Sequence, residues 1–241
     1  MQAIIMAGGK GTRLRPYTNI LPKPLLPIGN KSILDINIKQ LALSGVDNII
    51  IAVGYLGELI EAVIGNGNKY GIKINYSYED EPMGTVGGLG LMKSLLEDQF
   101  IVMNGDILHN LDFDHLFEEH IYSKKQVTIT TYSQQHTVRL GVLEIQDENI
   151  IKYVEKPTNK YIVSIGIYVF NKYVIDMFVK EKEFLDFPTL INILIQNQEK
   201  INSYMHDGLW IDIGTSEEYL NLIENLDKIV EENPLIPISI K

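Results

Sequence analysis

Cysteine is absent from the 241 residues of this chain. Neither a disulfide framework nor a thiolate metal site can form, and the composition suits a reducing compartment, so we expect a cytoplasmic protein. Long apolar runs are lacking as well. The apolar start, Met1 to Ala7, is about seven residues long and has no basic leader, which is too short for a signal peptide or a membrane span. It predicts a buried first strand.

Basic residues are scarce, with 21 Lys and Arg against 31 Asp and Glu, which gives a formal net charge of -10. This balance argues against a nucleic-acid partner, because binding a polyanion needs clustered cations that displace counterions. A small anion needs only a local group of cations. Such a group stands near the start of the chain, at Lys10, Arg13, Arg15 and Lys23. We therefore expect an anionic small-molecule substrate there.

The first half of the chain alternates short β-rich apolar runs with amphipathic helical stretches, which is typical of βαβ units. The predicted strands are 2–7, 48–53, 72–78 and 100–103, and the predicted helices are 32–44, 57–64 and 85–95. Apolar content of 45% is enough for a substantial core. We expect an α/β fold with a Rossmann-like, doubly wound, mostly parallel sheet covered on both faces.

From residue 126 to 170 the pattern changes to closely spaced strands, predicted at 127–132, 140–145, 150–154 and 161–170. We expect this β-rich insertion to form the wall of a second pocket. A helical stretch at 216–232 leaves only a short tail after it. No repeat, low-complexity run or Pro/Gly linker marks a boundary, so the sequence predicts a single domain, 1–241.

The segment AGGKGTRLRP, at residues 7–16, follows the predicted first strand. Gly8, Gly9 and Gly11 let backbone N–H groups approach phosphate oxygens without obstruction by a Cβ atom, so the segment is a candidate phosphate cradle. It is not a P-loop, because it lacks Gly-Lys-Ser/Thr. It also fails the dinucleotide-binding fingerprint, because Leu14 stands at the third-glycine position.

A second cationic element is close by, where Pro22 and Pro24 fix φ on both sides of Lys23 and so hold the ammonium group at a defined place. Together, GGKGTRLRP and PKP resemble the double signature of the sugar-1-phosphate nucleotidyltransferases, in particular the mannose-1-phosphate and heptose-1-phosphate guanylyltransferases. The resemblance runs from Met1 to about Leu222.

The resemblance implies a reaction in which a sugar 1-phosphate attacks a nucleoside triphosphate, giving an NDP-sugar and pyrophosphate. It assigns residues 1–125 mainly to the nucleotide, 126–215 mainly to the sugar phosphate, and 216–241 to a C-terminal helix and tail. Arg13 would hold the pyrophosphate portion, and Lys23 would screen the repelling anions. The expected nucleotide contacts are Ala7, Gly8, Gly9, Gly11, Thr12, Glu79, Gly84 and Thr85.

Two carboxylates are candidate magnesium ligands. The strand FIVMNGD ends in Asp106, at the carboxyl edge of the predicted sheet, where open α/β folds bind ligands. In similar proteins the equivalent of Asp106 holds Mg²⁺. Asp212, in GLWIDIGT, is the second candidate, because this segment is a near match to the closing motif of the family. A hard cation suits two carboxylates that leave sites for water or phosphate oxygens. Taken alone, Asp106 also fits a helix cap and Asp212 a turn.

The sugar-phosphate contacts are implied by resemblance alone. In similar proteins the equivalents of Glu155 and Lys156, within VEKP, bind sugar hydroxyls and the sugar phosphate, and Gly141 offers backbone near the sugar ring. Without the resemblance, a solvated ion pair is the commoner interpretation of VEKP. Ser164 stands where many relatives have Asn, so one sugar contact is altered and the sugar itself is left open.

The base pocket is expected at EDEPMGTVGG, residues 79–88. A carboxylate at Glu79 only accepts hydrogen bonds, which complements the N1–H and N2–H₂ donors of guanine and favours GTP. Relatives with Gln at this position often use thymidine or uridine nucleotides. Some uridylyltransferases also have Glu nearby, and Asp80 or Glu81 compete for the role, so a uridylyl-, thymidylyl- or cytidylyltransferase stays an alternative.

Two other function classes compete with the transferase. A non-catalytic nucleotide-sugar sensor should have lost a cation or a metal ligand, whereas this chain keeps the cations and carboxylates named above. A nicotinamide-dependent dehydrogenase fails on its glycine fingerprint. The sequence leaves the sugar, the pathway and the formation of a homo-oligomer open.

Overall fold

A seven-stranded sheet forms the centre of the molecule in the computed structural model, which describes residues 1–234, 236 and 237. The strand order is β12-β8-β11-β6-β1-β4-β5. All neighbours pair in parallel except β11, which runs antiparallel to both β6 and β8. The strands are β1 (Gln2–Ala7), β4 (Asn48–Val53), β5 (Lys73–Tyr78), β6 (Gln99–Asn104), β8 (Val127–Thr137), β11 (Thr158–Asn171) and β12 (Ile201–His206). The predicted α/β, mostly parallel sheet is confirmed.

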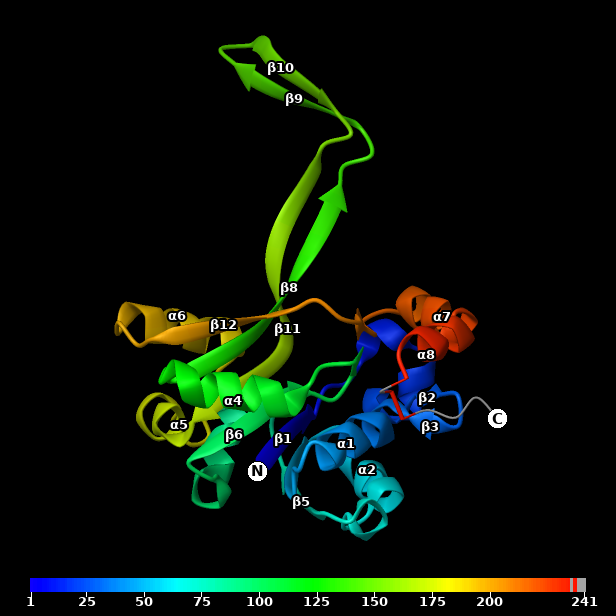
Figure 1. Ribbon diagram of the computed structural model, residues 1–241, viewed down its shortest axis with the longest axis vertical. Coiled ribbons are helices and arrows are strands. Elements are labelled where there is room, and N and C mark those ends of the chain that lie inside the picture. Colours follow the sequence, from blue (N-terminus) through cyan, green and yellow to red (C-terminus); the bar gives the residue numbers. More distant parts are fainter. Residues whose placement is uncertain (235, 238–241) are drawn as a thin grey trace.

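Helices cover both faces of this sheet because its central strands are apolar on both sides. Along β1, Ala3 and Ile5 belong to one buried cluster and Ile4 to the other. The first cluster contains α1 (Ile33–Leu43), α2 (Gly57–Ile64) and α4 (Phe113–Ser123); the second contains α3 (Gly84–Gly87), α5 (Lys172–Phe178) and α6 (Phe187–Gln196). The chain is therefore doubly wound (Figure 1). No helix of residues 1–234 is both long and apolar enough to cross a membrane.

The predicted helix at 85–95 is α-helical only over residues 85–87. After α3 the chain continues as a 3-10 helix, Gly88–Leu95. Its glycines favour a helix weakly, and the segment 180–185 packs its backbone onto them. A Cβ atom on Gly90 would stand 3.0 Å from the carbonyl oxygen of Lys180. Close backbone packing, which the apolar pattern does not reveal, explains the difference.

A third buried cluster connects the end of the chain to its start. The C-terminal helices α7 (Ser216–Glu224) and α8 (Leu226–Glu232) pack through Tyr219 and Leu222 against Leu14 and Ile213. The predicted helix at 216–232 is thus two helices, divided at Asn225. Residues 235 and 238–241 of the predicted tail lie outside the described residues.

The β-rich region differs most from expectation. Strand β8 begins inside the central sheet and leaves it, and β11 returns the chain to the sheet; beyond the sheet the two strands form a two-stranded ribbon, in which Thr137 pairs with Thr158. The ribbon continues into the hairpin of β9 (Gly141–Gln146) and β10 (Asn149–Glu155). Figure 1 shows this arm, residues 133–162, standing out from the body of the molecule. The strands were predicted, but their projection away from the body was not.

Candidate active site

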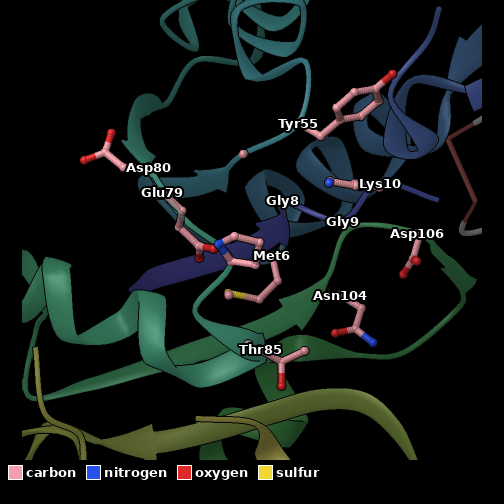
Figure 2. A pocket seen from close by; sticks show the side chains of 13 residues that line it. Met6, Gly8, Gly9, Lys10, Tyr55, Glu79, Asp80, Thr85, Asn104 and Asp106 are labelled. Atoms are coloured by element: carbon pink, nitrogen blue, oxygen red, sulfur yellow. The ribbon is translucent and has the colours of Figure 1, made fainter. Parts of the chain in front are cut away.

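The carboxyl ends of four parallel strands surround a cavity of about 790 Å³. Parallel strands end at one edge of a sheet, and ligands bind at that edge in open α/β folds. The cavity is lined by Met6, Gly8, Gly9, Lys10, Gly54, Tyr55, Glu79, Asp80, Pro82, Gly84, Thr85, Asn104 and Asp106. In Figure 2, Glu79 and Asp80 lie on one side of it, and Lys10 and Asp106 lie on the other. The cavity therefore has an acidic end and a mixed-charge end.

The glycine-rich loop separates this cavity from an adjoining one of about 260 Å³, which contains Ala7, Thr12 and Arg13 in its walls. Met6, Gly9 and Asp106 line both, so the two cavities meet. Gly11 has φ +57°, and a Cβ atom there would stand 3.1 Å from Cβ of Lys23. Only glycine fits this loop while the Lys23 segment packs against it.

Lys23 and Asp106 form an ion pair in the smaller cavity. Lys23 is buried, and it lies in a short 3-10 helix, Lys23–Leu25, flanked by Pro22. Asp106 follows β6, whose register is fixed because the Gly105 N–H donates to the carbonyl oxygen of Met6 at 3.0 Å. The ammonium group is thus held against the carboxylate of Asp106.

Asp212 lies beside this pair. Strand β13 (Trp210–Asp212) pairs antiparallel with β7 (Ile107–His109), with Asp212 opposite Ile107. Burial raises the pKa of the Asp212 carboxyl, and the charges of Asp106 and Glu218 raise it further, whereas Lys23 and Arg13 lower it. The two predicted metal ligands are neighbours, and the cations of the loop act on the same carboxylates.

Glu79 is the first residue after β5, and its N–H donates to the carbonyl oxygen of Val53 at 3.0 Å. Burial raises the pKa of its carboxyl, and a hydrogen bond from the backbone of Met83 opposes that change. The carboxylate lies against Gly88, where a Cβ atom would overlap it. Glu79 is therefore a half-buried acceptor held in place at the wall of the larger cavity.

We expect Gly88→Ala to weaken nucleotide binding by about tenfold, because the new methyl group displaces the Glu79 carboxylate from the cavity wall. The carboxylate is the end of a flexible side chain, so the fold should survive. Calorimetric titration with nucleotide, alongside a thermal melt, measures both effects. Gly65→Ala is a control at a glycine with open space around it, although its positive φ costs stability. Unchanged affinity in Gly88→Ala would contradict the role of the Glu79 position.

Gly84 and Thr85, which the resemblance implies as nucleotide contacts, also line the larger cavity. The Thr85 hydroxyl oxygen accepts from the Phe187 N–H at 3.0 Å, at the start of α6. Gly84 has φ +77°, and a Cβ atom there would clash with the carbonyl oxygen of Leu185. This wall of the cavity is thus pinned by the segment before α6.

The structure does not bring the predicted sugar-phosphate residues to either cavity. Glu155 and Lys156 lie on the arm and pair with each other at 3.7 Å. Gly141 lies on the same hairpin against the ring of Tyr153. Ser164 lies at the base of the arm, where its hydroxyl donates to the Tyr168 hydroxyl at 3.0 Å. Two residues on, Gly166 touches the Asn104 amide. Of these four predicted residues, Ser164 alone is near the cavity.

Several lining residues were not predicted as site residues, among them Tyr55 and Asn104. Gly54 and Tyr55 follow β4, and Asn104 ends β6, so the rule that ligands bind at carboxyl ends of strands would have identified them. Tyr55 adds a flat ring to the wall, and its hydroxyl donates to the carbonyl oxygen of Asn19 at 3.2 Å.

Comparison with known proteins agrees with this geometry. The profile of a family described as Nucleotidyl transferase matches residues 2–229. The chain belongs to this family. It is 34% identical over 227 residues to the D-glycero-alpha-D-manno-heptose 1-phosphate guanylyltransferase of Aneurinibacillus thermoaerophilus, covering 91% of this chain and 95% of the relative. It is 32% identical to a mannose-1-phosphate guanyltransferase of Yarrowia lipolytica, covering 99% of this chain and 68% of the relative.

Solved structures share the fold. HddC from Yersinia pseudotuberculosis complexed with GMP-PN has a TM-score of 0.73 and 26% identity, covering 93% of this chain and 99% of that one. A structure from Bacillus anthracis, assigned as a glucose-1-phosphate thymidylyltransferase, has a TM-score of 0.74 and 26% identity, covering 93% and 94%. The predictions of the family, of the Rossmann-like fold and of a nucleotidyltransferase enzyme are confirmed.

Proposed function

We propose that this nucleotidyltransferase transfers a guanylyl group from GTP to the phosphate of a sugar 1-phosphate, releasing pyrophosphate. The observation that carries the proposal is the distribution of charge across the two adjoining cavities. A half-buried carboxylate, Glu79, lies at one end, and the glycine-rich loop with Arg13 and Lys23 lies at the other. The relatives named as heptose- and mannose-1-phosphate guanylyltransferases support the same substrates.

The two ends of the cavity orient the nucleotide. The base belongs at the Glu79 end, because phosphates there would face Glu79 and Asp80 without a cation. The triphosphate belongs at the loop, where backbone N–H groups, Arg13 and Lys23 neutralise its charge. Only a base with adjacent N–H donors satisfies a carboxylate, which favours guanine.

Magnesium fits the carboxylates at the phosphate end. Among the described residues no group of three or more His, Cys, Asp or Glu could hold a metal, so a bound cation would draw further oxygen ligands from phosphates or water. Asp106 and Asp212 are adjacent, and the single ammonium group of Lys23 offsets only one of their two negative charges, so the pair keeps negative charge that attracts a cation. These two residues would hold Mg²⁺, which when bound supplies positive charge to the phosphate oxygens.

The chain's own residues contribute to catalysis by positioning the two substrates and by neutralising negative charge. An oxygen of the sugar phosphate attacks the α-phosphorus in line, and the bond from that phosphorus to the pyrophosphate oxygen breaks. No proton transfer is needed, since a phosphate dianion is already a nucleophile. Arg13 stabilises the departing pyrophosphate, and Lys23 reduces the repulsion between the two anions.

A substrate matrix tests the proposal. GTP, ATP, UTP, CTP and dTTP are each combined with mannose, heptose, glucose and N-acetylglucosamine 1-phosphates, and pyrophosphate release is recorded. GTP with one of the sugar phosphates should give the fastest release. Release with every triphosphate equally, or with UTP or dTTP ahead of GTP, would overturn the assignment of the base.

We expect Glu79→Gln to lower kcat/KM for GTP by about tenfold or more, because an amide presents a donor to one of the guanine donors. The same amide can donate to a pyrimidine carbonyl and accept from N3–H, so relative use of UTP or dTTP should rise. Competition assays with paired triphosphates measure this ratio. Asp80→Asn tests the adjacent acidic residue of the same cavity wall, which competes with Glu79 for contact with the base. If both variants keep the wild-type ratio, backbone contacts read the base.

A further inference from the structure

Helix α7 packs against the glycine-rich loop (Figure 1). Its Tyr219 belongs to the same buried cluster as Leu14, the residue that follows Arg13. The ring of Tyr17 lies edge-on to that of Tyr219, with 5.8 Å between the ring centroids. The Tyr219 hydroxyl donates to the carbonyl oxygen of Pro27 at 2.8 Å. The first turns of α7 and the segment that carries Arg13 are therefore fixed relative to each other.

Three charged groups meet at Gly214, just before this helix. A Cβ atom on Gly214 would stand 3.1 Å from Oε2 of Glu218 and 3.4 Å from Nη1 of Arg13. The same position is 3.3 Å from Oδ2 of Asp212. Because glycine has no side chain, nothing at this residue separates the guanidinium group from the two carboxylates.

The Glu218 carboxylate is held in place by the start of α7. Thr215 is the N-cap residue, and its hydroxyl oxygen accepts from the Glu218 N–H at 3.2 Å. The same hydroxyl donates to Oε2 of Glu218 at 2.9 Å. A carboxylate in the first turn of a helix is also stabilised by the helix dipole. The negative charge beside Gly214 is thus preorganised.

The Arg13 side chain is much less constrained. The residue is exposed, and within residues 1–234, 236 and 237 it forms no ion pair. A long exposed arginine side chain samples many rotamers, so placing its guanidinium group at one point costs conformational entropy. A fixed negative charge nearby favours the rotamers that approach it. In this structure such a rotamer lines the smaller cavity.

Of the two carboxylates at Gly214, Glu218 is the one whose charge stays available to Arg13. Asp212 is assigned to Mg²⁺ in the proposed reaction, and a bound divalent cation would cancel its attraction for a guanidinium group. Glu218 lines neither cavity, so it is placed to act on Arg13 without contacting the substrates.

We propose that Glu218 is a positioning residue of this active site, whose fixed carboxylate orients the Arg13 guanidinium group across Gly214 to receive the departing pyrophosphate. The inference rests on the role of Arg13 in the proposed function. Glu218 is itself an anion and repels the triphosphate, so it cannot strengthen ground-state binding. Its contribution therefore belongs in kcat rather than in KM.

Glu218→Gln tests this role, because glutamine keeps the length of the side chain and an oxygen for the Thr215 hydroxyl while it removes the charge. We expect kcat to fall about tenfold, with the KM for the triphosphate unchanged or lower. The thermal midpoint should not fall, since the charge of Glu218 also disfavours the ionised Asp212. Glu217→Gln is the matched control in the same helical turn, and it should keep wild-type kcat and KM.

A double-mutant cycle shows whether Glu218 acts through Arg13. In the Arg13→Ala background, Glu218→Gln should cause little further loss of kcat, because the group that it positions is gone. Wild-type kcat in Glu218→Gln alone would overturn the proposal. An equal loss in both backgrounds, or an equal loss in Glu217→Gln, would overturn it as well.

The cycle also separates this inference from the proposed function. All four proteins are assayed by pyrophosphate release with the triphosphate and sugar phosphate that the wild type uses fastest, so an incorrect base assignment leaves the cycle readable. Wild-type turnover in Arg13→Ala would overturn the role that the proposed function gives to Arg13. A large loss in Arg13→Ala without any loss in Glu218→Gln would overturn only the role of Glu218.

Discussion

Asp106→Asn and Asp212→Asn should each lower kcat by about a hundredfold or more while leaving the fold intact, as expected when charge stabilisation at a reacting phosphate is lost. Asp106 lines both cavities, and the pairing of β13 with β7, which follows Asp106 directly, places Asp212 beside it. Pyrophosphate release measured over a magnesium titration checks the expectation. The apparent magnesium affinity should fall together with the rate.

Asp212→Asn should lower turnover but should not lower the thermal stability of the fold. Burial raises the pKa of this carboxyl in the folded state, so its charged form costs stability at any pH above the unfolded pKa. Removing the charge should therefore leave the thermal midpoint unchanged or higher at neutral pH without divalent cations. An enzyme that loses turnover while gaining stability shows that the residue serves function rather than packing.

Asp207→Asn is the matched control, because Asp207 is exposed, precedes Asp212 by five residues and lines neither cavity. It should keep wild-type turnover and magnesium dependence. Full magnesium-dependent turnover in both Asp106→Asn and Asp212→Asn would show that the metal, if used, is held elsewhere.

The sheet and the position of the site were predictable because both depend on local pattern. Apolar runs such as 48–53 are buried on both faces, and they became parallel strands within one or two residues of the predicted bounds. Once strands are parallel, Gly8, Glu79 and Asp106 must reach the same edge, since each follows a strand end. The glycine-rich loop was identifiable from its three glycines in four positions, of which Gly11 takes a positive φ that favours glycine.

Long-range arrangement was not predictable in the same way. The neighbourhood of Asp106 and Asp212 depends on β7 pairing with β13, across more than a hundred residues of chain, and no periodicity encodes that pairing. Only the family resemblance suggested it. For the arm, the secondary structure was predictable but its position in space was not. Alternating patterns predicted its strands, but nothing local indicates that β8 and β11 continue beyond their sheet neighbours.

Lys23→Ala and Arg13→Ala should both lower turnover by about a hundredfold or more, because each removes a preorganised cation from the phosphate end of the cavity. Lys23→Ala should also lower the stability of the fold, and it should do so more than Arg13→Ala does. Lys23 pairs with Asp106 and also lowers the pKa of Asp212, so its loss leaves two neighbouring carboxylates with less compensation. Mutual repulsion should then destabilise the fold.

The pH dependence of that destabilisation has a definite sign. The folded pKa of Asp212 is already raised, and without Lys23 it rises further, so the cost of ionising this carboxyl grows as pH increases through that pKa. Lys23→Ala should therefore match the wild-type thermal midpoint most closely in mildly acid buffer and fall behind it towards neutral pH. Divalent cations are omitted from these melts so that no added charge replaces the ammonium group.

A double variant separates the two effects of Lys23. Lys23→Ala with Asp212→Asn removes the repulsion, so the thermal midpoint at neutral pH should return towards that of the wild type, while turnover should stay as low as in the single variants because the cation is still absent. Lys31→Ala, an exposed lysine on β3 (Lys31–Ser32) that lines neither cavity, is the matched control and should change neither quantity. If turnover recovers along with stability, Lys23 acts by offsetting the repulsion between the carboxylates. Near wild-type turnover in both Lys23→Ala and Arg13→Ala would mean that the triphosphate is bound away from the glycine-rich loop.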